Sequence, residues 1–283
     1  MKRLRTVSRV ALIANASICL GSVAAMTAVL RGHVPEERLH FASLAAVFGM
    51  LNVITAFLAT SLHAFERQGR RRALVLLALC CTTALAMELA GTTTGIPFGH
   101  YEYSDFLGPK FAGRVPYVMP LTWFSLLYPA LLLAERLRPP RLLLPLVAAL
   151  VLTLADVPMD PAMTSFYACW TWKDLGAHLL GTYYQMPLSN WAGWILTGAL
   201  VVELFRRIAR ARPAVESIAV PSLLYLTQCL FFAALDLVYG RPGATLGWLC
   251  GALVLGGALL LRNRSNTRAS MRDMSIVHEI SRG

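Results

Sequence analysis

Carboxyl and amide side chains stand at the ends of apolar stretches in this chain, where few polar groups are expected. Ionisable residues in such places are expensive to put in a membrane, so each is a candidate for function. A carboxyl group removed from water favours its neutral, protonated form and can therefore deliver a proton to a substrate. The side chains that we predict to act in catalysis are Asp156, Asp160, Glu88 and Asn190. Asp236 stands in a similar position.

Each of these residues, taken alone, also has a structural explanation. Glu88 or Asp236, within a turn of the membrane surface, could face the water around the lipid headgroups. Asp160 comes directly before Pro161 and could be a turn residue. Asp156 and Asp160 together, four residues apart, are harder to explain in this way. The convergence of all these residues at one membrane face favours a functional site.

Aromatic side chains are concentrated in the same part of the chain. Some of them are typical of the aromatic belt at a membrane surface, but Trp170 and Trp172 lie inside a loop, where a belt does not need them. Acids surrounded by aromatic faces suit a reaction through a carbocation, because the acid supplies the proton and the ring quadrupoles stabilise the cation. The residues that we expect to contact the substrate are Trp123, Tyr101, Tyr103, His100, Trp170, Trp172, Tyr183 and Trp191.

The elements that must position these residues are membrane helices. Of the 283 residues, 57% are hydrophobic and 14% are charged, whereas about 25% of the residues of a soluble domain are charged. Eight apolar stretches come close to the ~20 residues that cross ~30 Å of hydrocarbon. We therefore predict an all-α, polytopic transmembrane helical bundle of about eight spans. The predicted spans lie near residues 10–30, 42–64, 73–90, 116–134, 142–158, 188–205, 219–239 and 244–261.

Basic residues mark alternate connections between these stretches. Most of the 26 Lys and Arg residues lie at the N-terminus or follow the second, fourth, sixth and eighth stretches. By the positive-inside rule, both termini of this cell-membrane protein are cytoplasmic, and the candidate acids lie at the outer face. This pattern accounts for the net charge of +11, with anionic lipid headgroups as partners and no nucleic acid.

Two outer connections, at about 91–115 and 159–187, are long and rich in aromatic residues, Gly and Pro. Long loops in compact proteins are usually functional, and we expect these two to lie over the acids. Within the first loop, His100 is expected to brace the loop rather than to transfer protons. Residues 1–262 are predicted to form a single integral-membrane domain, and residues 263–283 a polar, disordered cytoplasmic tail.

The stretch from Glu88 to Tyr103, ELAGTTTGIPFGHYEY, resembles the central signature of the integral-membrane carotenoid 1,2-hydratases. That family includes the gamma-carotene and bisanhydrobacterioruberin hydratases. Further similar blocks follow in the family's order over roughly 85–205. They are LGPK at 107–110, PLTW at 120–123, Asp156 with DPAM at 160–163, WTW at 170–172 and YYQMPLSNWAGW at 183–194.

The resemblance implies a carotenoid biosynthesis enzyme, a hydratase of the lyase class. It would add water to the terminal C1–C2 double bond of an acyclic carotenoid end group and leave a tertiary alcohol, with no redox cofactor. We assign the proton to Asp156 or Asp160, and the positioning of water to Glu88 and Asn190. The implied partners are the carotenoid substrate, water and the lipid bilayer, with other carotenoid biosynthesis enzymes as further partners.

Two other functions are compatible with the sequence. A membrane cyclase of the lycopene type also begins by protonating an isoprenoid double bond. A transporter or a carotenoid-binding scaffold is the second alternative, but transporters favour polar groups at mid-membrane, and here the centres of the spans are apolar. The six cysteines have no metal-binding spacing, so no metal site is predicted.

Overall fold

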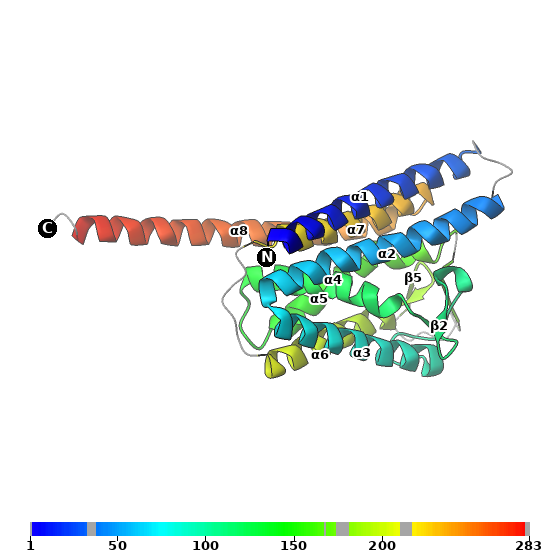
Figure 1. Cartoon of the computed structure of the whole chain (residues 1–283), viewed down its shortest axis with the longest axis horizontal. Helices are drawn as coiled ribbons and strands as arrows, with labels where there is room; N and C mark the ends of the chain where they lie inside the picture. Colours follow the sequence, from blue (N-terminus) through cyan, green and yellow to red (C-terminus); the bar gives the residue numbers. More distant parts are fainter. Residues whose placement is uncertain (1, 33–37, 167, 174–180, 210–216, 281–283) are drawn as a thin grey trace.

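The structure is a computed structural model that describes residues 2–32, 38–166, 168–173, 181–209 and 217–280, with the backbone alone at residues 2, 38–41 and 265–280. Within these residues the fold is all-α, with eight α-helices (Figure 1). The helices are α1 (Lys2–Leu30), α2 (Arg38–Gln68), α3 (Arg70–Thr94), α4 (Met119–Leu137), α5 (Leu144–Met163), α6 (Ser189–Ile208), α7 (Ala219–Val238) and α8 (Pro242–Ile280).

Six of these helices, α1, α2, α3, α5, α7 and α8, are long and apolar enough to cross a membrane. α4 and α6 also coincide with predicted spans but do not meet that criterion. Every residue of α4 from Trp123 to Ala134 is buried. A helix that is apolar on all sides belongs in the interior of a bundle. The protein is therefore a polytopic membrane bundle built around α4.

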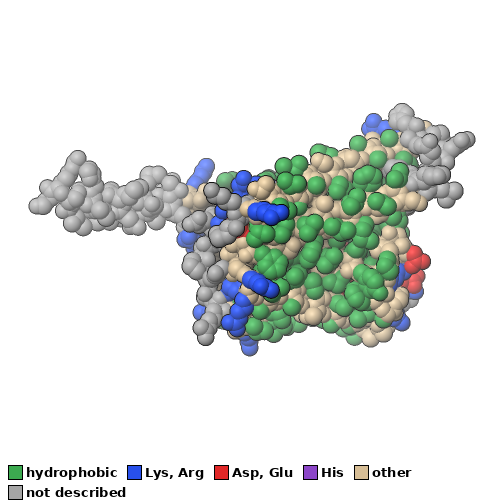
Figure 2. Space-filling model, in the orientation of Figure 1, with side chains coloured by type: hydrophobic (Ala, Val, Ile, Leu, Met, Phe, Trp, Pro, Cys, Tyr) green, Lys and Arg blue, Asp and Glu red, His purple; other side chains and the backbone are tan. Residues whose placement is uncertain are grey.

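The helices run side by side, with the short strands at one end of the bundle (Figure 1). α1, α2 and α7 pack together at one edge, α3 and α6 at the other, and α4 and α5 between them. Figure 2 shows that Lys and Arg side chains gather mainly at the end opposite the strands, while hydrophobic side chains cover the surface between. The uneven charge of the sequence thus becomes a difference between the two ends of the molecule.

Antiparallel strands β1 (Tyr101–Tyr103) and β4 (Trp170–Trp172) join the two long loops. Tyr101 pairs with Trp172, and Tyr103 with Trp170. Successive side chains of a strand point to opposite faces, so Tyr101 and Tyr103 are buried while Glu102 is exposed. The remaining short elements are the 3-10 turn η1 (Asp105–Leu107) and the paired strands β2 (Lys110–Phe111) with β3 (Val115–Pro116) and β5 (Thr182–Tyr183) with β6 (Met186–Pro187).

α5 runs beyond the predicted fifth span and ends at Met163, with two prolines in its last two turns. The last four carbonyl groups of a helix have no donor within the helix. One of them, the carbonyl oxygen of Pro161, accepts hydrogen bonds from the Ser165 hydroxyl group and from the Arg241 guanidinium group, both at 2.7 Å. The second long loop therefore begins later than predicted, and Asp160 is a helical residue.

α8 projects from the bundle and continues as one helix to Ile280 (Figure 1). The sequence led us to expect a disordered tail from residue 263, whereas the described backbone is helical there. An α-helix satisfies its backbone hydrogen bonds within the segment, so it can continue past the last apolar residues without a packing partner. The domain boundary at residue 262 and the cytoplasmic position of the tail stay predictions.

Candidate active site

Asp156 and Asp160 lie four residues apart on α5, so their carboxyl groups are on the same face of the helix. Both side chains are buried, with 1% exposure each. Asn190, in the first turn of α6, donates through Nδ2 to Asp156 Oδ2 (2.9 Å) and to Asp160 Oδ2 (3.2 Å). One amide group thus bridges two carboxyl groups, and these three candidate residues form one cluster.

Trp170 and Met186 complete this cluster from the loops. Trp170 in β4 donates its indole N–H to Asp160 Oδ1 (2.6 Å), and the Met186 sulfur lies 2.9 Å from Asn190 Nδ2. The backbone of Trp170 is held by its pairing with Tyr103 in β1. Strand pairing between the two loops therefore places an indole donor directly on the acid.

Glu88 forms a second buried polar cluster, on α3. Its Oε2 accepts hydrogen bonds from the hydroxyl groups of Tyr101 and Tyr103, the latter at 2.8 Å, and its Oε1 accepts one from Trp123 Nε1 (2.8 Å). Both carboxyl oxygens are therefore engaged by protein donors. This geometry suits Glu88 better to holding these three aromatic side chains than to positioning water, the role expected from the sequence.

The two tyrosines of this cluster are permanent donors. Burial, followed by the neighbouring Glu88 carboxyl group, raises the pKa of Tyr101 and of Tyr103 well above the usual value. Both phenols therefore keep their protons at neutral pH. Both phenols of the Glu88 cluster can thus act as hydrogen-bond donors throughout the physiological pH range.

Aromatic contacts connect the two clusters. The rings of Tyr103 and Trp170 meet edge to face, with centroids 5.9 Å apart. Such pairs contribute about 0.5–1.5 kcal/mol beyond the burial of their area. A continuous path of contacts therefore runs from Glu88 through Tyr103 and Trp170 to Asp160.

Trp194 belongs to the site but was not among the predicted residues. Its indole stacks on that of Trp123, with centroids 4.3 Å apart and an interplanar angle of 21°. It lies on α6 four residues after Asn190, and residues four apart share a helix face. That spacing is the sequence signal that could have included it.

Tyr183 brings a third acid, Asp236 on α7, into the group. Burial raises the pKa of Tyr183, and the charges of the nearby Tyr184, Asp236, Asp156 and Asp160 raise it further. The Tyr183 hydroxyl group is therefore close enough to all three carboxyl groups to interact with them electrostatically. The Asp236 side chain is fully buried, and among the described residues neither of its oxygens has a hydrogen-bond partner. The indole N–H groups of Trp172 and Trp191 lie toward the carboxyl groups of Asp160 and Asp156. The Tyr183 hydroxyl group, like Asp236, has no hydrogen-bond partner in the described part of the chain. Since buried polar groups nearly always have partners, these groups mark a place for water or a substrate.

His100 is the one predicted site residue that the structure does not bring to the acids. Its side chain is exposed. Its ring lies against Gly95, where an added Cβ would be 2.8 Å from His100 Cδ2, and its carbonyl oxygen accepts a hydrogen bond from Lys173 N (2.8 Å). These contacts brace the loop. In the described ranges, no three His, Cys, Asp or Glu side chains are grouped so that they could hold a metal ion.

Phe98 packs against two aromatic side chains of the Glu88 cluster. Its ring lies 6.2 Å from that of Tyr101 and 6.3 Å from that of Trp123, between centroids, and both of these residues donate to Glu88. On its other side it rests on Gly193 of α6, where an added Cβ would be 2.7 Å from Phe98 Cε1. Only glycine leaves room for the ring at this point.

Gly193→Ala is therefore expected to lower the free energy of unfolding by about 1–3 kcal/mol, as overpacking does, and to displace Phe98 from beneath the tyrosines. Thermal unfolding in detergent measures the effect. Gly256→Ala, where an added Cβ meets nothing within 4 Å, is the matched control and should not destabilise the protein. A Tm that is unchanged in Gly193→Ala would contradict the described packing of Phe98.

Comparison with known proteins identifies the family. A family model described as "Carotenoid biosynthesis protein" matches residues 48–259. The chain belongs to this family. It is also 33% identical over 146 residues to the bisanhydrobacterioruberin hydratase of Haloarcula japonica, an alignment that covers 50% of this chain and 47% of the relative. The chain thus spans about half the length of the curated relative that it matches. No solved structure matches it.

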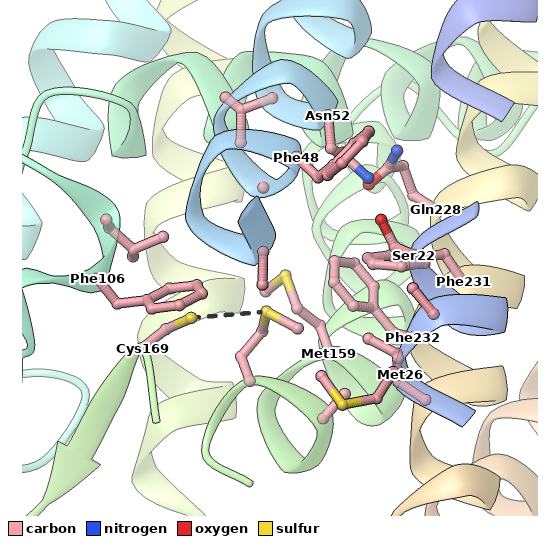
Figure 3. A pocket seen from close by; sticks show the side chains of 18 of the residues that line it. Ser22, Met26, Phe48, Asn52, Phe106, Met159, Cys169, Gln228, Phe231 and Phe232 are labelled. Carbon is pink, nitrogen blue, oxygen red and sulfur yellow. Dashed lines mark hydrogen bonds between the residues drawn. The ribbon is translucent and has the colours of Figure 1, made fainter. Parts of the chain in front are cut away.

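In this carotenoid biosynthesis protein, a cavity of about 500 Å³ lies beside the Asp156–Asp160 pair. Trp170 lines the cavity and also donates to Asp160. Met159 and Met163, on α5 before and after Asp160, line it as well. Figure 3 shows Phe106 and Cys169 beside each other in the wall of this cavity. Trp170 therefore connects this apolar chamber to Asp160, which is not itself among the residues that line it.

Proposed function

We propose that the protein adds water to the terminal C1–C2 double bond of an acyclic carotenoid end group. The observation that carries the proposal is the pair of buried acids, Asp156 and Asp160, bridged by Asn190 beside an apolar cavity. Membership of a carotenoid biosynthesis family supports the substrate class, and the relative named as a hydratase supports the reaction.

The reaction needs one proton donor and one water molecule. The carboxyl group transfers its proton to C2, and the electron pair of the double bond forms the new C–H bond, which leaves a tertiary cation at C1. The oxygen of a water molecule bonds to C1, and one proton of that water returns to the carboxylate. The atoms and charges balance, nothing is oxidised or reduced, and a side chain of the protein supplies and recovers the proton.

Asp160 is the proton donor in this proposal, because its hydrogen-bond partner Trp170 also lines the cavity. Asp156 and Asn190 hold the water molecule that attacks C1. The ring faces of Trp170, Trp172 and Tyr183 stabilise the cation, as aromatic faces do for cations within about 6 Å. Glu88 acts through the side chains that it holds.

The site lies at the outer face of the membrane in this proposal, and both chain termini are cytoplasmic. The gathering of Lys and Arg side chains at the end of the bundle opposite the strands supports this orientation (Figure 2), since basic residues are concentrated on the cytoplasmic side. The carotenoid reaches the site from the bilayer, water reaches it from the outer surface, and other carotenoid biosynthesis enzymes are its partners.

Expression of the full chain in a lycopene-producing bacterium, followed by mass spectrometry of the pigments, tests the function. We expect a product heavier than the substrate by one water molecule, from lycopene or from a carotenoid that is cyclised at one end or elongated. Cells that carry the empty vector provide the control. A product of unchanged mass but altered spectrum would indicate a cyclase instead, and unaltered pigments with all three substrates would exclude the hydratase.

A further inference from the structure

The cavity beside Trp170 has a polar wall that the proposed reaction does not use. It is formed by Ser22 of α1, Asn52 of α2 and Gln228 of α7, which lie close together in Figure 3. Asn52 and Gln228 are 7% and 5% exposed, so each is more than nine-tenths buried. Most other side chains that line the cavity are apolar. Three helices thus contribute a polar group each to one side of a hydrophobic chamber.

Hydrogen bonds behind the wall fix the orientation of both amide groups. Asn15 donates through Nδ2 to the backbone carbonyl oxygen of Asn52 (2.9 Å) and to Thr55 Oγ1 (3.1 Å). The Oδ1 atom of Asn15 is therefore the one that accepts from Gln228 Nε2 (2.9 Å). Asn52 Nδ2 donates to the Cys19 sulfur (3.1 Å). Both amide nitrogens are therefore directed into the protein, away from the cavity.

The two amide oxygens, Asn52 Oδ1 and Gln228 Oε1, are left without a hydrogen-bond partner among the described residues, and neither is sealed from the cavity. An amide oxygen can accept two hydrogen bonds, and the Ser22 hydroxyl group can donate or accept. Unpartnered acceptors are rare in protein interiors. The wall is therefore complementary to a ligand that carries a hydrogen-bond donor.

The cavity opens toward the region that lipid chains occupy. Leu44 and Phe48 of α2 line it and are also 54% and 42% exposed, on a helix that is apolar enough to cross a membrane. Met26 and Met159 also line the cavity and are buried, and methionine side chains adapt to ligands of irregular shape. The ligand that fits is an apolar chain that enters from the bilayer and bears one hydroxyl group.

We propose that this cavity binds the hydroxyl-bearing end of an isoprenoid chain, whose O–H donates to the amide oxygens of Asn52 and Gln228. The proposal rests on the proposed function and extends it, because hydration at one end of a carotenoid produces such a chain. A hydrocarbon carotenoid leaves both acceptors unpaired. The protein would therefore hold a carotenoid that already carries one hydroxyl group more tightly than its hydrocarbon precursor.

The full chain in lipid nanodiscs, with Asp160→Asn to prevent turnover, provides the test. It is titrated with lycopene and with singly hydrated lycopene, and quenching of tryptophan fluorescence reports binding. We expect the hydroxylated carotenoid to bind about five- to tenfold more tightly, as one buried hydrogen bond predicts. Equal affinities, or tighter binding of lycopene, would overturn the proposal.

Variants of the wall test the assigned residues. Asn52→Leu and Gln228→Met replace the amides by apolar side chains of similar size and should remove the preference without weakening the binding of lycopene. Ser22→Ala is a smaller change than either amide substitution, and it should reduce the preference for the hydroxylated carotenoid. Thr60→Val is the control, because its buried hydroxyl group donates to Ala56 O in its own helix (2.9 Å) and does not line the cavity. A preference that survives both amide substitutions would contradict the assignment.

The binding test and the test of function can fail separately. If the protein prefers the hydroxylated carotenoid but hydrates no carotenoid, the cavity proposal is supported and the hydratase function is excluded. If the protein hydrates a carotenoid in cells but binds both carotenoids equally, the hydratase function is supported and the cavity proposal is excluded. Hexadecanol that displaces the carotenoid alcohol at equal concentration would overturn the assignment of an isoprenoid ligand.

Discussion

Replacing Asp160 by asparagine is expected to lower the rate of hydration by about 10²- to 10⁴-fold, the contribution of a positioned general acid. Asparagine keeps the size of the side chain and an oxygen that can accept the hydrogen bond from Trp170, but it has no acidic proton. The fraction of hydrated pigment in cells that contain equal amounts of membrane-inserted protein measures the effect. Asp156→Asn should also lower the rate, because Asp156 shares Asn190 with the proton donor.

Asp105→Asn is the matched control for this experiment. Asp105 is an acid in the neighbouring long loop, with a fully exposed side chain 2.7 Å from Lys110 Nζ. The hydrogen bond from Lys110 holds the pKa of Asp105 below its usual value. It is therefore ionised at neutral pH and cannot supply a proton, so its replacement should leave hydration unchanged. If Asp160→Asn retained activity like this control, the proton donor would have to be another residue.

Replacing Glu88 by leucine is expected to lower the free energy of unfolding by at least about 3 kcal/mol. Three buried donors, from Tyr101, Tyr103 and Trp123, would lose their acceptor, and each unsatisfied buried group is unfavourable by about 1–3 kcal/mol. Thermal unfolding in detergent measures the loss of stability. Hydration should be lost as well, because Tyr103 packs against the tryptophan that holds Asp160.

Two further variants separate hydrogen bonding from charge and size. Glu88→Gln keeps one acceptor oxygen and should be more stable than Glu88→Leu. Glu203→Gln removes a carboxyl group that is partly exposed and pairs with Arg206 and Arg207 at the helix surface, and it should change stability by less than about 1 kcal/mol. A Tm of Glu88→Leu equal to that of the unchanged protein would show that the tyrosines do not depend on this acid.

The helical architecture could be predicted because the transfer of side chains into hydrocarbon depends on local composition. Each predicted apolar stretch overlaps a helix of the structure. The prolines of α5 misled the prediction of its end, because local propensity ends a helix at proline. In the structure α5 continues through Pro158 and Pro161 to Met163, and Ser165 and Arg241 donate to the Pro161 carbonyl oxygen in its last turn. Arg241 follows α7 in the chain, 80 residues after Pro161, and no local pattern connects it to α5.

The pairing of the acids could be predicted only in part. The spacing of Asp156 and Asp160 places them on one face of a helix, whatever surrounds that helix. Neither the bridging amide of Asn190 nor the indole of Trp170 follows from spacing, because α5, α6 and β4 meet only in the folded chain. The sequence also suggested that Glu88 positions water, and the structure instead surrounds it with three donors.

The sequence by itself determined that the chain is a membrane bundle with acids and aromatic residues at one end, since hydrophobicity and helical spacing are properties of neighbouring residues. Only the tertiary structure decided which donor meets which acid, and that Asn52 and Gln228 from separate helices turn their amide oxygens into one cavity. Hydrogen bonds require partners within about 3 Å in the right direction. Such contacts depend on how distant segments pack.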